Sequence, residues 1–247
     1  MNTHRPFISC FVISLCILIP SLLLGQLVWT EPAFPTVDDQ VTLYYNSALG
    51  NGELQGVIPV YIHTGVITSN SSGPSDWQNV QTAWGTSDPL ALLNPEGNGI
   101  HTFDFNGLTL SDYYQLDEGE TVESLAMVFR NSSGTLVGRN ADGSDIFYEV
   151  SSGSFSTSLQ TPENGYAVLD LGDTYTILGQ ASESCELSLE INGEVVTTVT
   201  GTSLSYDFEA NDAGQFNIAL VGTTDAGSAS DEASIAVLPN SPITGWP

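Results

Sequence analysis

Basic side chains are almost missing from this sequence, and lysine is missing entirely. The 247 residues include three arginines against 29 acidic residues, which gives a formal net charge of −26 at pH 7. Binding to nucleic-acid phosphates requires a basic surface, so a nucleic-acid partner is excluded. Charged residues make up only 13% of the chain, which is about half of their usual share. The surface must therefore be built mainly from Ser, Thr, Asn, Gln and Gly.

Cysteine is scarce as well, with 3 residues. Cys10 and Cys16 lie in an apolar N-terminal segment, so Cys185 is the single cysteine of the remaining chain. That part cannot form an internal disulfide and must be stabilised by packing, for which it is long enough. In the segment CELSLE, Cys185 shares one strand face with Leu187 and Leu189. This alternation predicts a buried, inert thiol.

Catalytic signatures are also lacking. Only His63 and His101 remain after the N-terminal segment, and the chain has no G-x-S-x-G, H-E-x-x-H, C-x-x-C or phosphate-binding loop motif. Acid pairs such as Asp38-Asp39 arise from composition alone, so they do not identify a glycosidase. The sequence predicts no catalytic residues, no bound metal and no cofactor. A jelly-roll glycosidase is retained as the third alternative.

Residues 1–25 are typical of a secretory signal peptide. His4 and Arg5 precede an apolar run from Ile8 to Leu24, and the small Gly25 precedes Gln26 at a plausible cleavage point. The alternative is a membrane anchor, but the run is short for a span and contains Pro20. We therefore expect a secreted or cell-surface protein without a membrane span in the mature chain. Its two arginines against 29 acids give a formal charge of −27, which suggests a marine or hypersaline setting.

Short apolar runs separated by Gly, Asn, Asp, Pro and Ser clusters favour β-strands throughout. The fold class expected is all-β, with two tandem antiparallel, Ig-like β-sandwiches after the signal peptide. The expected runs are Val41–Tyr45, Val57–Ile62, Ile100–Phe105, Leu125–Phe129 and Ile146–Val150 in the first sandwich, with one helical turn at Ser111–Gln115. The predicted divisions are a first sandwich at 26–150, a linker at 151–162, a second sandwich at 163–239 and a truncated linker at 240–247.

The second sandwich is expected to contain about seven strands. Asn192-Gly193 between two of them is the strongest short hairpin signal in the chain. The expected strands are Tyr166–Leu171, Tyr175–Leu178, Cys185–Ile191, Val195–Val199, Leu204–Phe208, Phe216–Val221 and Ala233–Leu238.

Two tryptophans point to a binding surface in the first sandwich. Trp77 and Trp84 bracket the polar segment DWQNVQTAWG, with Gly73, Pro74 and Gly85 at its flanks. An indole in such a loop has its face available, and a flat aromatic face suits the C–H-rich side of a sugar ring. The alternative is that one or both tryptophans cap the core of the sandwich.

The first sandwich resembles the N-terminal starch-binding modules of secreted bacterial α-amylase-family enzymes, which are similar to carbohydrate-binding families 25 and 26. The resemblance covers residues 28–150. It rests on PVYIHTGVIT (59–68), on Asp76-Trp77 and Trp84-Gly85, and on VFRN (128–131) and GRNADGSDIF (138–147). The second sandwich resembles bacterial Ig-like and fibronectin-like spacers.

The resemblance implies an α-glucan partner. It places His63 at a strand position of the site and Trp77 and Trp84 at stacking positions; some starch binders carry a further aromatic where this chain has Leu136. It also implies that a catalytic domain follows in the full-length parent. The alternative function is a structural or adhesive cell-surface protein.

Two features near Arg139 have more than one interpretation. Arg139 can donate to sugar hydroxyls or pair with a nearby acid, and the abundance of acids favours pairing. The stretch Asp142-Gly-Ser-Asp145 suggests a calcium loop but lacks the other spaced ligands of an EF-hand. We therefore expect a turn there.

Overall fold

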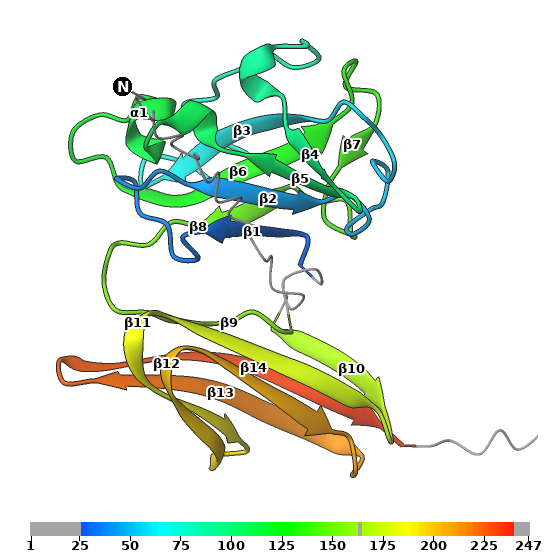
Figure 1. Cartoon of the computed structure of the whole chain (residues 1–247), viewed down its shortest axis with the longest axis vertical. Helices are drawn as coiled ribbons and strands as arrows, with labels where there is room; N and C mark the ends of the chain where they lie inside the picture. Colours follow the sequence, from blue (N-terminus) through cyan, green and yellow to red (C-terminus); the bar gives the residue numbers. More distant parts are fainter. Residues whose placement is uncertain (1–25, 163–164, 240–247) are drawn as a thin grey trace, which may run out of the picture.

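The computed structural model describes residues 26–162 and 165–239. The predicted signal peptide and the predicted C-terminal linker lie outside these described residues. Two β-sandwiches follow one another along the chain, and Figure 1 shows them as two separate layered bodies. The prediction of an all-β chain with two sandwiches is confirmed. Within the described ranges, no helix combines the length and apolarity that crossing a membrane requires.

The first sandwich consists of two four-stranded sheets. One has the order β1 (Val28–Glu31), β2 (Thr42–Asn46), β5 (Ile100–Phe103) and β4 (Asn94–Gly97). The other has β3 (Tyr61–Thr68), β6 (Val122–Arg130) and β7 (Val137–Gly138) in order, with β8 (Ile146–Glu149) also paired to β6. All these pairs are antiparallel. Single turns of helix lie between β3 and β4 at η2 (Pro89–Ala91), and between β5 and β6 at η3 (Phe105–Gly107) and α1 (Leu110–Tyr114).

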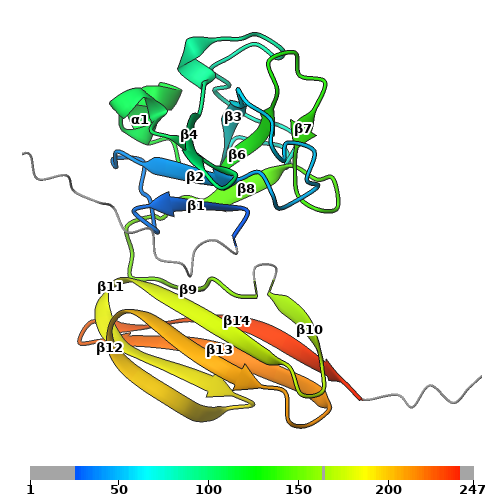
Figure 2. The same cartoon turned by 45° about the vertical axis from the view of Figure 1, so that its right-hand side comes forward.

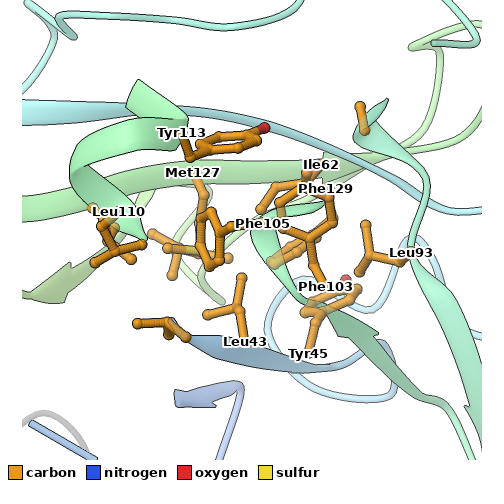
Figure 3. Packing of buried hydrophobic residues seen from close by; sticks show 14 of the residues in the cluster. Leu43, Tyr45, Ile62, Leu93, Phe103, Phe105, Leu110, Tyr113, Met127 and Phe129 are labelled. Atoms are coloured by element: carbon orange, nitrogen blue, oxygen red, sulfur yellow. The ribbon is translucent and has the colours of Figure 1, made fainter. Parts of the chain in front are cut away.

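Aromatic rings fill the space between these two sheets. Tyr45 from β2 stacks on Phe129 from β6 with centroids 3.7 Å apart, which ties the sheets together. Phe103 and Phe105 meet edge to face at 5.0 Å, and Tyr113 of α1 packs on both (Figure 3). Helix α1, which matches the predicted helical turn, therefore closes one end of the core with its tyrosines rather than adding a further layer.

The second sandwich has longer strands than predicted. Its strands are β9 (Thr157–Leu159), β10 (Tyr166–Asp170), β11 (Thr174–Ile191), β12 (Glu194–Glu209), β13 (Gly214–Thr224) and β14 (Gly227–Leu238). Two pairs of predicted strands are each one continuous strand, β11 and β12. A bulge between Gln180 and Cys185 lets β11 pair with β9 before it and with β13 after it. One long strand thus contributes to both layers.

The predicted hairpin and the predicted buried thiol of the second sandwich are both present. Asn192 and Gly193 both have positive φ, 53° and 82°, and join β11 to β12 as the predicted hairpin. Cys185 is buried and free, as expected. One pair departs from the antiparallel pattern, because β10 runs parallel to β14.

The segment predicted as a linker, 151–162, contains a strand that pairs with the second sandwich. Strand β9 lies inside it and pairs with β11, and Leu159 is buried in the core of the second sandwich. Gln26 of the first sandwich donates to the side chain of Gln160 at 2.7 Å across the junction. In both views β1 and β8 lie on the side of the first sandwich that faces the second, whereas β3 lies away from it (Figures 1 and 2).

Candidate functional site

The candidate site lies on the outer face of the sheet formed by β3, β6 and β8. Alternate residues of β3 point to opposite faces, so Ile62 and Val66 enter the core while His63 and Gly65 face outward. The register pairs His63 with Val128 and Gly65 with Ala126. The outer face therefore carries little side-chain bulk at Gly65 and Ala126, which lets a neighbouring segment approach Gly65 closely.

Trp77 is held beside this part of the sheet, because the next residue, Gln78, forms an antiparallel bridge with Val66 at the edge of β3 that faces away from β6. The backbone of Gln78 forms two hydrogen bonds with Val66, at 2.8 and 2.9 Å. A Cβ atom added to Gly65 would lie 2.7 Å from the Gln78 carbonyl oxygen and 3.3 Å from the Trp77 Cβ. The Trp77 indole N–H donates to the Pro74 carbonyl at 3.0 Å. The Trp77 N–H is thus satisfied by the chain itself, and the residue is partly exposed.

His63, Trp77 and Trp84 are brought together, although they are up to 21 residues apart in sequence. The His63 ring lies 5.9 Å from Trp77 at an interplanar angle of 31°, and 5.1 Å from Trp84 at 88°. Trp84 is 47% exposed, while His63 and Trp77 are half-buried. None of the three belongs to the main core cluster. The two indole planes are inclined to each other by at least 57°, the difference between the two measured angles.

Arg130 is a site residue that sequence reasoning did not identify. It is fully buried at the end of β6, with its guanidinium carbon 5.2 Å from the Tyr61 ring centroid and 5.9 Å from that of Trp84. It donates to the carbonyls of Thr86 at 2.5 Å and Asn131 at 3.1 Å. Arg130 therefore anchors the segment that carries Trp84. The sequence feature that could have identified Arg130 is its place at the end of the otherwise apolar run AMVFR. A charge that is buried in such a strand requires hydrogen-bond or charged partners.

The loop after β6 packs against the nitrogen-bearing edge of the Trp84 indole. Gly134 has a φ of 72°, and a Cβ atom at that position would lie 3.0 Å from the Trp84 indole nitrogen. Leu136, in the stretch where some starch binders carry an aromatic, is 38% exposed. Trp84 is thus wedged between this loop, Arg130 and His63, which fixes the orientation of its exposed ring.

Burial keeps His63 neutral at pH 7. Desolvation is the largest cause that lowers its pKa, the Arg130 charge lowers the pKa further, and Asp145 opposes both. A neutral imidazole both donates and accepts hydrogen bonds. Its Nδ1 is buried without a hydrogen-bond partner among the described residues.

Arg139 is placed in an ion pair, as the abundance of acids suggested. Its guanidinium contacts the carboxylate of Asp145, and both side chains remain about one-third exposed. The Asp142 carboxylate accepts hydrogen bonds from the Ser144 backbone at 2.9 Å and hydroxyl at 2.6 Å, so this stretch is a turn. In the two described ranges, no group of three or more His, Cys, Asp or Glu is arranged to hold a metal.

No protein-family model matches this chain, and no curated protein matches its sequence. Among solved structures it is similar to fibronectin(III)-like modules of Clostridium thermocellum CbhA, at 19% identity and a TM-score of 0.30, over 35% of this chain and 98% of that one. It is also similar to the endo-beta-1,4-mannanase from Thermotoga petrophila (13% identity, TM-score 0.29, 36% of this chain and 21% of that one). A further similar structure holds the N-terminal four Ig domains of Dscam1 (12% identity, TM-score 0.27, 72% and 38%). These likenesses concern β-sandwich modules and say nothing about a ligand.

Proposed function

We propose that the first sandwich is an α-glucan-binding module and that His63, Trp77 and Trp84 form its binding surface. The observation that carries this proposal is the pair of inclined indoles around one neutral histidine. Half-buried Trp77 and exposed Trp84 offer two ring faces at an angle of at least 57°. Two sugar rings stacked on these faces must be inclined by a similar angle. Helical α-linked glucans bend in this way, whereas flat β-1,4-linked ribbons do not.

Charge supports a neutral ligand. The chain carries 29 acidic residues and no lysine, so an anionic polysaccharide would be repelled. Arg130 is committed to backbone carbonyls and Arg139 to Asp145, so neither arginine is free for an anionic group. Arg139 retains partial exposure and serves this proposal as a hydroxyl donor at the margin of the site, not as a charge receptor.

The wider role follows as part of the same proposal. The module acts as a secreted or cell-surface accessory region of an amylase-type enzyme, without a catalytic site of its own, and the second sandwich is a spacer. A purely structural or adhesive role is the alternative. It predicts that the protein binds no oligosaccharide at all.

Isothermal titration with maltoheptaose and cellohexaose tests this proposal. We expect the maltooligosaccharide to bind and the cello-oligosaccharide to bind far more weakly. Trp77→Ala and Trp84→Ala should each weaken maltoheptaose binding by about 1–3 kcal/mol, the range of an aromatic hot spot. His63→Ala should weaken it less. Val195→Ala, at an exposed position of the second sandwich, is the matched control.

Two results would contradict the proposal. If both tryptophan variants bind like the parent and melt at lower temperature, the indoles serve packing alone. If cellohexaose binds as well as maltoheptaose, the inclined planes do not select the curved ligand.

A further inference from the structure

Phe147 is an exposed aromatic residue that the proposed site does not use. It lies on β8 with 39% of its surface exposed, between the buried Ile146 and the core-packed Tyr148. The register pairs Phe147 with Ala126, and Ala126 with Gly65. Residues paired across neighbouring strands share one face. Phe147 therefore lies on the same outer face as His63 and Gly65, and its strand β8 is two strand spacings, or roughly 10 Å, from β3.

Exposed aromatic rings are rare in this protein. Among the exposed large apolar side chains of the described residues, the aromatic ones are Trp84, Phe147 and Tyr166. Two of these three lie on this one face of the first sandwich. Single exposed apolar residues need no explanation, but aromatic rings that gather on one sheet face next to a groove do.

A groove joins Phe147 to the segment that holds Trp77. Its volume is about 350 Å³, and its wall includes Pro74, whose carbonyl accepts the Trp77 indole N–H. The groove is also lined by Ser71, Ser72, Glu123, Ser124 and Phe147. Hydroxyls and a carboxylate beside an aromatic ring match the alternating polar and C–H surfaces of a sugar.

We infer that a bound glucan chain continues past Trp77 along this groove and over Phe147, which adds a third stacking position. This inference rests on the proposed function. Phe147 also lines the larger cavity of about 700 Å³ between the two sandwiches. The proposed path of the glucan therefore leads from the tryptophans beside His63 toward the second sandwich. The carboxylate of Glu123 restricts this position to neutral sugar units, because an acidic unit would meet like charge.

Ligand length separates this position from the tryptophan site. Maltotriose is short enough to bind at Trp77 and Trp84 alone, whereas maltoheptaose extends to Phe147. We expect Phe147→Ser to reduce maltoheptaose affinity about two- to tenfold, the range of one aromatic contact, and to leave maltotriose affinity unchanged. Phe147→Tyr should retain the affinity of the parent for both ligands. Val195→Ser, at an exposed apolar position of the second sandwich, controls for loss of an apolar surface group.

The possible outcomes separate the two proposals. If the parent binds maltoheptaose but Phe147→Ser changes neither affinity, or changes both equally, the extended path is wrong and the tryptophan site stands. If the parent binds neither ligand, the proposed function fails and the path fails with it. Melting temperatures of both serine variants show whether any loss comes from unfolding.

Discussion

The two sandwiches differ in the length of their strands and of the loops between them. In the second, strands reach 18 residues and are joined by tight turns such as Asn192-Gly193. In the first, no strand exceeds 9 residues and long loops run between the strands. The loop after β3 returns to the free edge of this strand through the bridge between Gln78 and Val66, and it brings Trp77 and Trp84 to His63. In the first sandwich much of the chain thus forms loops that hold side chains on a surface, whereas in the second most of the chain forms the strands themselves.

The same difference is visible at glycines that lie close to a neighbour. A Cβ on Gly65 in the first sandwich would meet the backbone oxygen of Gln78 at 2.7 Å. A Cβ on Gly179 in the second would meet the end of the Leu220 side chain, also at 2.7 Å. A side chain can rotate away, whereas a backbone held by two hydrogen bonds cannot. The same distance of 2.7 Å therefore predicts a larger loss of stability for an added methyl group at Gly65 than at Gly179.

Gly65→Ala should have the largest effect and provides the sharpest test of this comparison. We expect a loss of about 1–3 kcal/mol in unfolding free energy, typical of overpacking, and a loss of maltoheptaose binding as Trp77 is displaced. Gly179→Ala, the matched variant, should cost less and leave binding unchanged. Urea unfolding and titration of both variants measure these effects. Parental affinity in Gly65→Ala would show that the loop does not depend on close packing at Gly65.

Sequence patterns predicted the framework better than they predicted the site. The hairpin at Asn192-Gly193 and the buried face of Cys185 follow from local turn chemistry and alternation, and both are present. Strand β4 was missed because its sequence, NPEG, opposes strand formation, and it forms through pairing with β5. The continuity of β11 and β12 was missed because polar stretches such as Ser182–Ser184 resemble breaks.

The sequence predicted the part of the site that depends on local features, but not the part that depends on the tertiary structure. Loop tryptophans and a strand histidine are visible in the sequence, and the structure places them in contact. The position of Arg130 beneath Trp84 depends on the outward side of β6 and on the path of two loops. No local pattern contains this information. Phe147 likewise becomes relevant only through the register that aligns β8, β6 and β3.

Salt should affect the two sandwiches unequally. Sixteen acidic residues and both Arg130 and Arg139 lie in 26–150, whereas the remaining 13 acids lie after residue 150, where there is no Lys, Arg or His. Repulsion between carboxylates is long-ranged at 10 mM salt, where the Debye length is about 30 Å, and is screened within about 3 Å at 1 M. We expect both sandwiches to gain stability with salt, and the second to gain more.

The expected gain for the second sandwich is on the order of 1 kcal/mol, which is roughly 4–8 °C in melting temperature for a domain of this size. Hydrogen exchange followed by mass spectrometry resolves the two sandwiches across sodium chloride from 10 mM to 2 M. Maltoheptaose affinity, measured over the same range, should change little because the ligand is neutral. An equal response of both sandwiches would indicate that the two arginines do not relieve the repulsion in the first.

Histidine titration should change the stability of the first sandwich only, since no histidine follows His101. Burial lowers the pKa of both His63 and His101, and His101 is 4% exposed with an Nδ1 that has no partner among the described residues. In the unfolded chain both return to about 6.5. The unfolded state therefore binds more protons between that value and the lower folded pKa. Stability must fall as the pH drops through this window and level off below it.

The slope is at most about 1.4 kcal/mol per pH unit for each histidine. Carboxylates with ordinary pKa values near 4 stay ionised above about pH 5.5, so a series from pH 7.5 to 5.5 isolates the histidines. His101→Phe removes one titration and keeps an aromatic ring beside Tyr45, whose centroid lies 6.1 Å away. We expect urea unfolding of the first sandwich, followed by tryptophan fluorescence, to show a shallower pH dependence in this variant. Hydrogen exchange in the second sandwich, corrected for the intrinsic pH dependence of exchange, should show no change in stability over the same range. An unaltered slope in His101→Phe would mean that burial of this imidazole does not contribute to the pH response, and the asymmetry between the sandwiches would then rest on His63 alone.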